Sequence, residues 1–144
     1  MVPFLHGREL QGGVVNMGFD WNCGELATGL ECYRREQFFE AHEHWEAVWL
    51  RSKEPEKTFL QALIQVTAAF HHLQRKNQRG AMSLLHSALK RLMPYPPRFG
   101  GLEVNSLRQD IESWIRTLES DDMPVHGRFP RIQRETAGNE SGSL

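Results

Sequence analysis

The sequence contains few cysteines and no long apolar run, and both shortages exclude classes of protein. Cys23 and Cys32 are the two cysteines among 144 residues. Nine positions at about 100° each place them on opposite sides of a helix, so the sequence predicts neither a disulfide framework nor a thiolate metal site. No apolar run approaches the roughly 18 residues of a membrane span, and the first residues lack a secretory signal. We therefore expect a cytoplasmic protein that does not engage a membrane.

Strand patterns are also scarce, whereas helical spacing is frequent. No segment alternates apolar and polar residues cleanly, but apolar residues recur at i, i+3, i+4 and i+7 from Leu26 to Leu118. The composition, 40% hydrophobic and 24% charged, is typical of a folded chain. The sequence predicts an all-α fold, a single compact domain of about five helices in an antiparallel bundle or open array. The helices are expected near residues 22–34, 36–51, 55–76, 81–93 and 106–120.

The two ends of the chain lack this periodicity. We expect a flexible N-terminal segment at 1–20, the helical domain at 21–120 and a disordered C-terminal tail at 121–144. No internal repeat is recognisable in the sequence.

The second expected helix carries a histidine in the middle of an aromatic face. At about 100° per residue, Phe38, His42, Trp45 and Trp49 fall within about 60° of arc. Glu46 follows His42 by one turn on the flank of this face, and Glu43 lies further round. An imidazole and a carboxylate are thus expected within reach of each other.

The third expected helix is apolar over most of its circumference, apart from a narrow polar stripe. Because an unpaired buried polar group costs about 1–3 kcal/mol, the stripe needs partners, and the second helix offers them. We predict a polar layer between the two helices. Its members are His42, Glu43, Glu46, Trp49, Gln61, Gln65 and His72.

This layer has two interpretations. It fixes how the helices pack, or it is a site in which His42, Glu46 and His72 bind a divalent metal. The candidate catalytic residues are His42, Glu43 and Glu46, but His42-Glu43-x-x-Glu46 lacks the second histidine of the zinc-protease motif. We favour a helical ligand-binding or protein-interaction domain over an enzyme. A metal-dependent or histidine-based hydrolase is the alternative.

Basic residues are concentrated in one stretch, at 75–98, which contains no acidic residue. Binding of phosphate or nucleic acid through this stretch is a second alternative. The formal net charge of −1 argues against nucleic acid as a partner. The partner and a homo-oligomeric state stay open.

Three motifs resemble a known family. They are Phe39 to Trp49 (FEAHEHWEAVW), Leu60 to Gln65 (LQALIQ) and His72 to Ala81 (HLQRKNQRGA). Together they resemble domain-of-unknown-function family 309 (DUF309) over about residues 22–118, with Ala62 and Lys76 in place of the family's glycines. The resemblance implies a compact all-helical domain without an established activity. The family's motif positions are matched by His42, Glu43, Glu46, Trp49, Gln65, His72, Asn77 and Gly80.

Two of these matched residues are expected to have a structural role. Asparagine tolerates left-handed backbone at a helix end, and glycine permits a tight turn or a close approach. We therefore assign Asn77 and Gly80 to the turn between the third and fourth helices.

Overall fold

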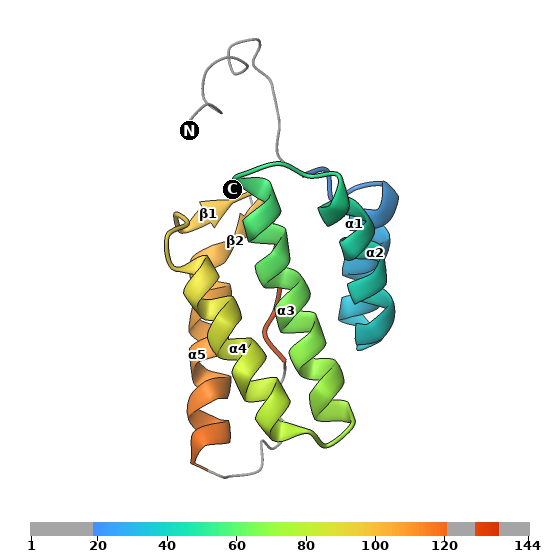
Figure 1. The fold of residues 1–144 in the computed structure, drawn as a ribbon. Coiled ribbons are helices and arrows are strands. Elements are labelled where there is room, and N and C mark those ends of the chain that lie inside the picture. Colours follow the sequence, from blue (N-terminus) through green and yellow to red (C-terminus); the bar gives the residue numbers. More distant parts are fainter. Residues whose placement is uncertain (1–18, 121–128, 136–144) are drawn as a thin grey trace, which may run out of the picture.

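Five helices make up most of the computed structural model, which describes residues 19–120 and 129–135. They follow the order α1 to α5 along the chain (Figure 1). The mainly-α fold predicted from periodicity is confirmed, and the helix bounds lie close to the expected ones. These bounds are Gly24–Arg34 for α1, Phe38–Leu50 for α2, Glu56–Gln74 for α3, Gln78–Leu92 for α4 and Val104–Glu119 for α5.

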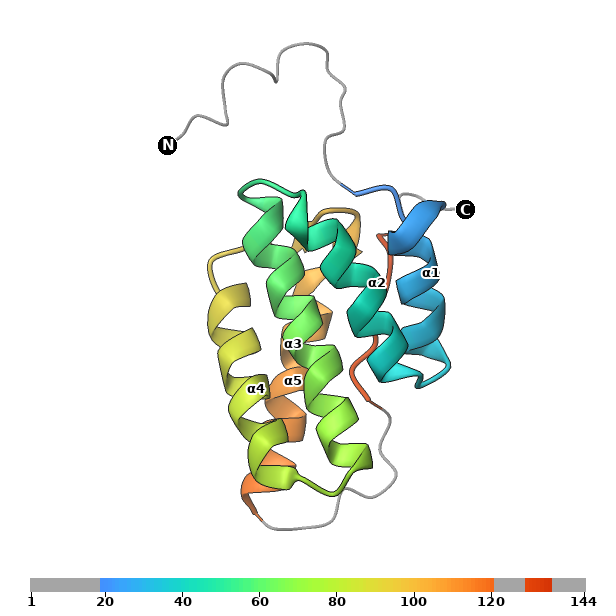
Figure 2. The same cartoon turned by 45° about the vertical axis from the view of Figure 1, so that its right-hand side comes forward.

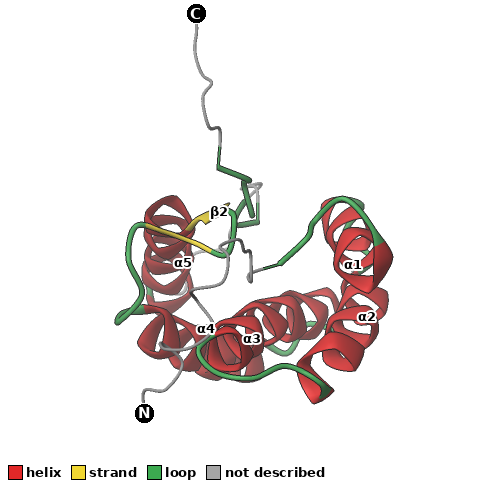
Figure 3. Ribbon diagram, turned by 90° about the horizontal axis from the view of Figure 1, so that it is seen from above, coloured by secondary structure: helices red, strands yellow, loops and turns green. Residues whose placement is uncertain are grey.

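The longest helix, α3, is the central one. It packs on α2 along one side and on α4 along the other, and Figure 2 shows it between these two helices. Seen from above, the helices follow one another around a curve with α1 and α5 at its ends (Figure 3). Such a central position requires apolar residues on two flanks, which explains why α3 is apolar over most of its circumference.

The α1–α2 and α3–α4 connections have the same backbone structure, although the sequence shows no repeat. Glu36 and Lys76 both adopt a left-handed backbone, with φ of 62° and 63°. The next amide in each turn, Gln37 N–H or Asn77 N–H, donates to the carbonyl five residues before it at 2.8 Å. This is the Schellman pattern that ends many helices. The two helical hairpins are therefore related by an offset of 40 residues, from Gln37 to Asn77.

A two-stranded antiparallel hairpin between α4 and α5 was not predicted. It consists of β1, Arg98–Phe99, and β2, Leu102–Glu103. The intervening Gly100 and Gly101 have φ of 62° and 81°, and a two-residue type I′ turn needs positive φ at both positions. With two residues in each strand, the hairpin is too short to produce an alternating pattern.

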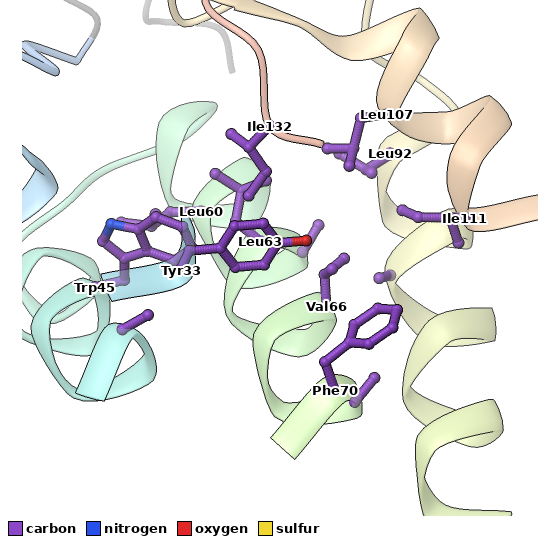
Figure 4. Packing of buried hydrophobic residues seen from close by; sticks show 14 of the residues in the cluster. Tyr33, Trp45, Leu60, Leu63, Val66, Phe70, Leu92, Leu107, Ile111 and Ile132 are labelled. Atoms are coloured by element: carbon purple, nitrogen blue, oxygen red, sulfur yellow. The ribbon is translucent and has the colours of Figure 1, made fainter. Parts of the chain in front are cut away.

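The core lies on the inner side of the helical curve. Figure 4 shows Tyr33 and Trp45 next to Leu60 and Leu63 of α3, with Ile111 of α5 further along. Helices α1 and α2 approach closely at Gly29, where a β-carbon would overlap the indole of the fully buried Trp45. Glycine at this position allows the indole to fill the space between the two helices.

Residues 129–135 pack against this core as an extended segment, although the sequence predicts a disordered tail at 121–144. Pro130 and Ile132 are buried, and Phe129 is partly buried. The rest of the predicted tail, 121–128 and 136–144, lies outside the described residues. So does nearly all of the N-terminal segment predicted at 1–20. No described helix is long and apolar enough to cross a membrane.

Candidate functional site

The candidate site lies along α2 and α3, which run antiparallel. Their register is fixed at both ends of α2. At one end, the Phe38 and Phe70 rings are 5.7 Å apart between centroids, and at the other, Lys57 Nζ lies 4.2 Å from the centroid of Trp49. His42 and Gln65 both lie between these two contacts along their helices. They therefore stand at similar heights in the helix pair.

Three side chains along these helices have buried polar atoms without a hydrogen-bond partner in the described part of the chain. The atoms are His42 Nδ1, Trp49 Nε1 and Gln65 Oε1. A fourth such atom, Arg91 Nε, belongs to the neighbouring helix α4. Each buried and unsatisfied group of this kind costs about 1–3 kcal/mol. Four such atoms on three adjacent helices require an explanation.

Trp49 differs in this respect from two other tryptophans. Trp21 Nε1 donates to the Gly100 carbonyl at 2.7 Å, and Trp45 Nε1 donates to the Leu26 carbonyl at 3.2 Å. Both of these indoles are held by the fold itself. The Trp49 indole nitrogen is equally shielded from solvent but is given no acceptor by the described residues.

The other members of the predicted polar layer do not supply the missing partners. Glu43 and Glu46 are exposed, and no hydrogen bond joins them to α3 within residues 19–120 and 129–135. His72 Nδ1 instead lies 3.0 Å from Asn77 Nδ2, at the turn into α4. Gln61 is half-buried. The structure therefore separates His72 from His42 and leaves the two carboxylates at the surface.

One histidine contact was missed in the sequence. His44 Nδ1 lies 2.8 Å from Glu25 Oε1 and links α2 to α1. The helical-wheel argument directed attention to His42 because of its aromatic neighbours, whereas His44 points away from that face. Its link to α1 gives it a structural role.

An exposed phenylalanine extends the face at one end. Phe39 is 50% exposed, and its ring stacks on His42 at 6.4 Å and lies 5.5 Å from His71 between centroids. Lys57 covers Trp49 at the other end. The face thus combines accessible aromatic surface with buried atoms that can form hydrogen bonds.

The geometry gives little support to the metal and hydrolase alternatives. No three histidine, cysteine or acidic side chains in the described ranges are grouped closely enough to hold a metal ion. Neither nitrogen of His42 bonds to a carboxylate in those ranges, so no acidic partner orients the imidazole as a general base.

Asn77 and Gly80 lie at the start of α4. Asn77 is the N-cap, and its Oδ1 accepts from Gly80 N–H at 3.0 Å. The left-handed residue of this turn is Lys76, with φ of 63°, rather than Asn77. The asparagine therefore contributes its side-chain acceptor to the turn and does not adopt the left-handed conformation expected of it.

The basic stretch is divided between the two ends of α4. Arg75, Lys76 and Arg79 lie at its start, and Lys90 and Arg91 lie in its last turn. Eleven residue steps of helix, from Arg79 to Lys90, separate these groups by about 17 Å. The stretch therefore does not form one continuous basic surface.

The fold and the site define a mainly-α domain with a polar face on two antiparallel helices. Residues 26–84, from α1 to the first half of α4, match the model of the family described as "Domain of unknown function (DUF309)". The match includes all three motifs that resemble this family. None of the curated proteins compared with the chain matches it.

Proposed function

We propose that this protein is a ligand-binding domain whose site is the polar face of α2 and α3, extending to α4. The observation that carries the proposal is the set of buried polar atoms without partners on His42, Trp49 and Gln65. All three residues also match motif positions of the family they resemble. Two independent features, an unpaired buried atom and a motif position, thus coincide at the same three residues.

The unpaired atoms define the chemistry of the ligand. An indole N–H only donates and an amide oxygen only accepts, so Trp49 needs an acceptor and Gln65 needs a donor. Amide groups offer both kinds of partner, and a ligand can present them to the two side chains separately. We therefore infer a neutral ligand with an amide or similar group, and its apolar part would lie against the exposed Phe39 ring.

A purely structural polar layer would have a different appearance. Its polar atoms would have hydrogen-bond partners within the fold, as the Trp45 indole has in the Leu26 carbonyl. Polar side chains that are buried without partners lower the stability of the unliganded protein, and proteins often accept such a cost at functional sites. Ordered water would reduce this cost and would be displaced on binding.

Stability measurements on apolar variants test this proposal. Replacing an unsatisfied polar group by an apolar one of similar shape should be neutral or stabilising. Trp49→Phe and Gln65→Leu should therefore leave the free energy of urea unfolding unchanged or raise it. The matched control, Trp45→Phe, should lower it, because this indole is fully buried and bonded. Losses of more than about 2 kcal/mol in both test variants would indicate a structural layer and contradict the proposal.

A binding measurement complements the stability test. N-methylacetamide carries one amide donor and one acceptor, and its addition to ¹⁵N-labelled protein can be followed at the indole N–H signals. The Trp49 signal should shift with saturation, whereas those of Trp21 and Trp45 should not, because their donors are already bonded. Equal drifts of all three signals would show that the amide has no specific site here.

We further infer a cytoplasmic location. Cys23 and Cys32 are free thiols, and an intracellular reducing environment preserves thiols in this state.

A further inference from the structure

A second surface, on the inner side of the helical curve, is filled by residues 129–135. Phe70, which lines this surface, and Gln65 of the polar face are five positions apart on α3, or about 140° round the helix. The two surfaces are therefore distinct. The contacts of residues 129–135 do not involve His42, Trp49 or Gln65 of the ligand site.

The side chains of the segment enter the core at two points. The Phe129 ring lies 5.1 Å from that of Tyr33 and 5.4 Å from that of Phe38, edge to face in both cases, and 6.4 Å from that of Phe70. Ile132 is 5% exposed and belongs to the core cluster. An aromatic and an aliphatic side chain, three positions apart, thus anchor an extended chain on surfaces from three helices.

The backbone of the segment is bound as well. Tyr33 Oη donates to the Pro130 carbonyl, and Asp110 Oδ2 accepts from Arg131 N–H at 3.2 Å. Further along, Glu103 N–H donates to the Gln133 carbonyl and the Gly101 carbonyl accepts from Glu135 N–H, both at 2.8 Å.

The last two bonds, with an antiparallel bridge between Leu102 and Arg134, add the segment to the edge of the β1–β2 hairpin. Domains that recognise extended peptides combine the same two elements, strand addition at a sheet edge and pockets for alternate side chains. Curved arrays of helical hairpins likewise present concave binding surfaces. The segment is therefore bound in the way that a peptide ligand would be.

We propose that this inner surface is a peptide-binding site, that residues 129–135 are its resident ligand, and that it accepts an extended aromatic-Pro-x-aliphatic segment of a partner protein. The proline suits the site because its missing N–H is not needed, whereas its carbonyl meets the Tyr33 hydroxyl. A partner segment takes the place of residues 129–135 and forms the same backbone hydrogen bonds.

Competition between the two segments provides the test. The probe is a fluorescein-labelled peptide with the sequence of residues 129–135, FPRIQRE, and binding is followed by fluorescence polarisation on the full-length chain. Because the tethered segment competes at an effective concentration in the millimolar range, the wild-type protein should bind the peptide weakly. Ile132→Ala weakens the tethered segment and should tighten peptide binding by about tenfold or more, in proportion to the affinity that the segment loses.

A control peptide and the behaviour of the variant protein make the outcome decisive. A peptide with alanine in place of its isoleucine should bind Ile132→Ala protein more weakly than the original peptide. Absence of binding to folded Ile132→Ala protein would overturn the proposal, and so would failure of this variant to fold, because the segment would then be an indispensable part of the core. A wild-type dimer that dissociates on addition of the peptide would assign the site to a second copy of this chain and overturn the assignment to a partner protein.

Hydrogen exchange on the wild-type protein gives a test without substitutions. If the segment is exchangeable, the amides of Glu103 and Glu135 should exchange through a local opening, faster than the amides of the α3 core. Equal protection of both groups, with exchange only through global unfolding, would contradict the proposal.

Discussion

The Tyr33 hydroxyl donates to the Pro130 carbonyl at 2.5 Å, so a residue of α1 holds a chain segment 97 positions later. Tyr33 is 1% exposed, and its phenol has its hydrogen-bond partner in a segment that the helical periodicity did not predict to be ordered. This pair links the helical core to residues 129–135 and makes the stability of the core sensitive to alkaline pH.

The first prediction concerns this pH dependence. Burial, and next the negative charge of Asp110, raise the pKa of Tyr33 well above its ordinary value of 10.0. Above about pH 10 the unfolded chain loses this proton and the folded chain keeps it, so the free energy of unfolding falls by about 1.4 kcal/mol per pH unit from this group. Tyr33→Phe should lose about 1 kcal/mol at pH 7 through the missing hydrogen bond. It should also show a shallower decline between pH 10 and 11.

Urea unfolding of both proteins at pH 7, 10 and 11 measures these effects. Tyr95→Phe is a second test, because burial raises the pKa of this half-buried phenol to about 12, and its removal should also make the decline between pH 10 and 11 shallower. Equal slopes for wild-type and Tyr33→Phe protein above pH 10 would show that Tyr33 ionises freely in the folded state.

The sequence was sufficient for the helices but not for the segments that connect or cover them. The spacing of Leu26, Leu30 and Tyr33 reports one buried face directly, because helix periodicity depends on local chain geometry. The hairpin at 98–103 depends on Gly100 and Gly101, a recognisable turn signal with strands too short to support it. The order of 129–135 depends on partners far away in the sequence, which no local pattern reports.

The candidate site shows the same division. The position of His42 in the aromatic face of α2 follows from helical angles alone. The partners of His42 could not be derived from helical angles. An angle gives the direction of a side chain, but it does not say which helix lies in that direction or in what register that helix packs. Gln65 lies about 80° round α3 from Lys57, the residue that contacts α2 at Trp49. The His42 imidazole and the Gln65 amide, which the sequence predicts to lie in one layer, therefore do not hydrogen-bond to each other.

A second prediction concerns the close approach of α1 and α2. A β-carbon on Gly29 would overlap the Trp45 indole, which is fully buried and bonded to the Leu26 carbonyl. Gly29→Ala should therefore lower the free energy of unfolding by about 1–3 kcal/mol despite the better helix propensity of alanine. Chemical denaturation measures the loss, with Thr28→Ala on the exposed side of α1 as the matched control.

The cause of this loss can be tested with a double-mutant cycle. If Gly29→Ala acts through the indole, its cost should be smaller in a Trp45→Phe background, where the smaller ring leaves room. The same cost in both backgrounds would place the strain elsewhere.

A third prediction uses the equivalence of the two helical hairpins. Asn77 caps α4 through its side chain, whereas Gln37, at the same place in the first turn, forms no side-chain cap bond with α2. Asn77→Ala should cost about 1 kcal/mol of stability, and Gln37→Ala should be close to neutral. Thermal unfolding of the two variants provides the comparison, since the turns share their backbone hydrogen bonds. Equal losses would mean that the side chain of Asn77 is not responsible for the difference.

The last prediction concerns the reactivity of an exposed thiol before α1. Cys23 Sγ donates to Asp20 Oδ2 at 3.2 Å, and this hydrogen bond, followed by the charge of the carboxylate, raises the pKa of the thiol above its ordinary value of 9.0. Because only the thiolate reacts with iodoacetamide, Cys23 should be alkylated more slowly at pH 8 than its exposure suggests.

Asp20→Asn removes the negative charge and should therefore accelerate alkylation of Cys23. Mass spectrometry of the two cysteine-containing peptides gives both rates in one sample. Cys32 is the internal control, because its pKa is raised mainly by burial and then by the charge of Glu40, neither of which involves Asp20. Its rate should stay the same. A parallel increase at Cys32 would mean that Asp20→Asn loosens the fold, and an unchanged rate at Cys23 would show that the carboxylate does not control the thiol.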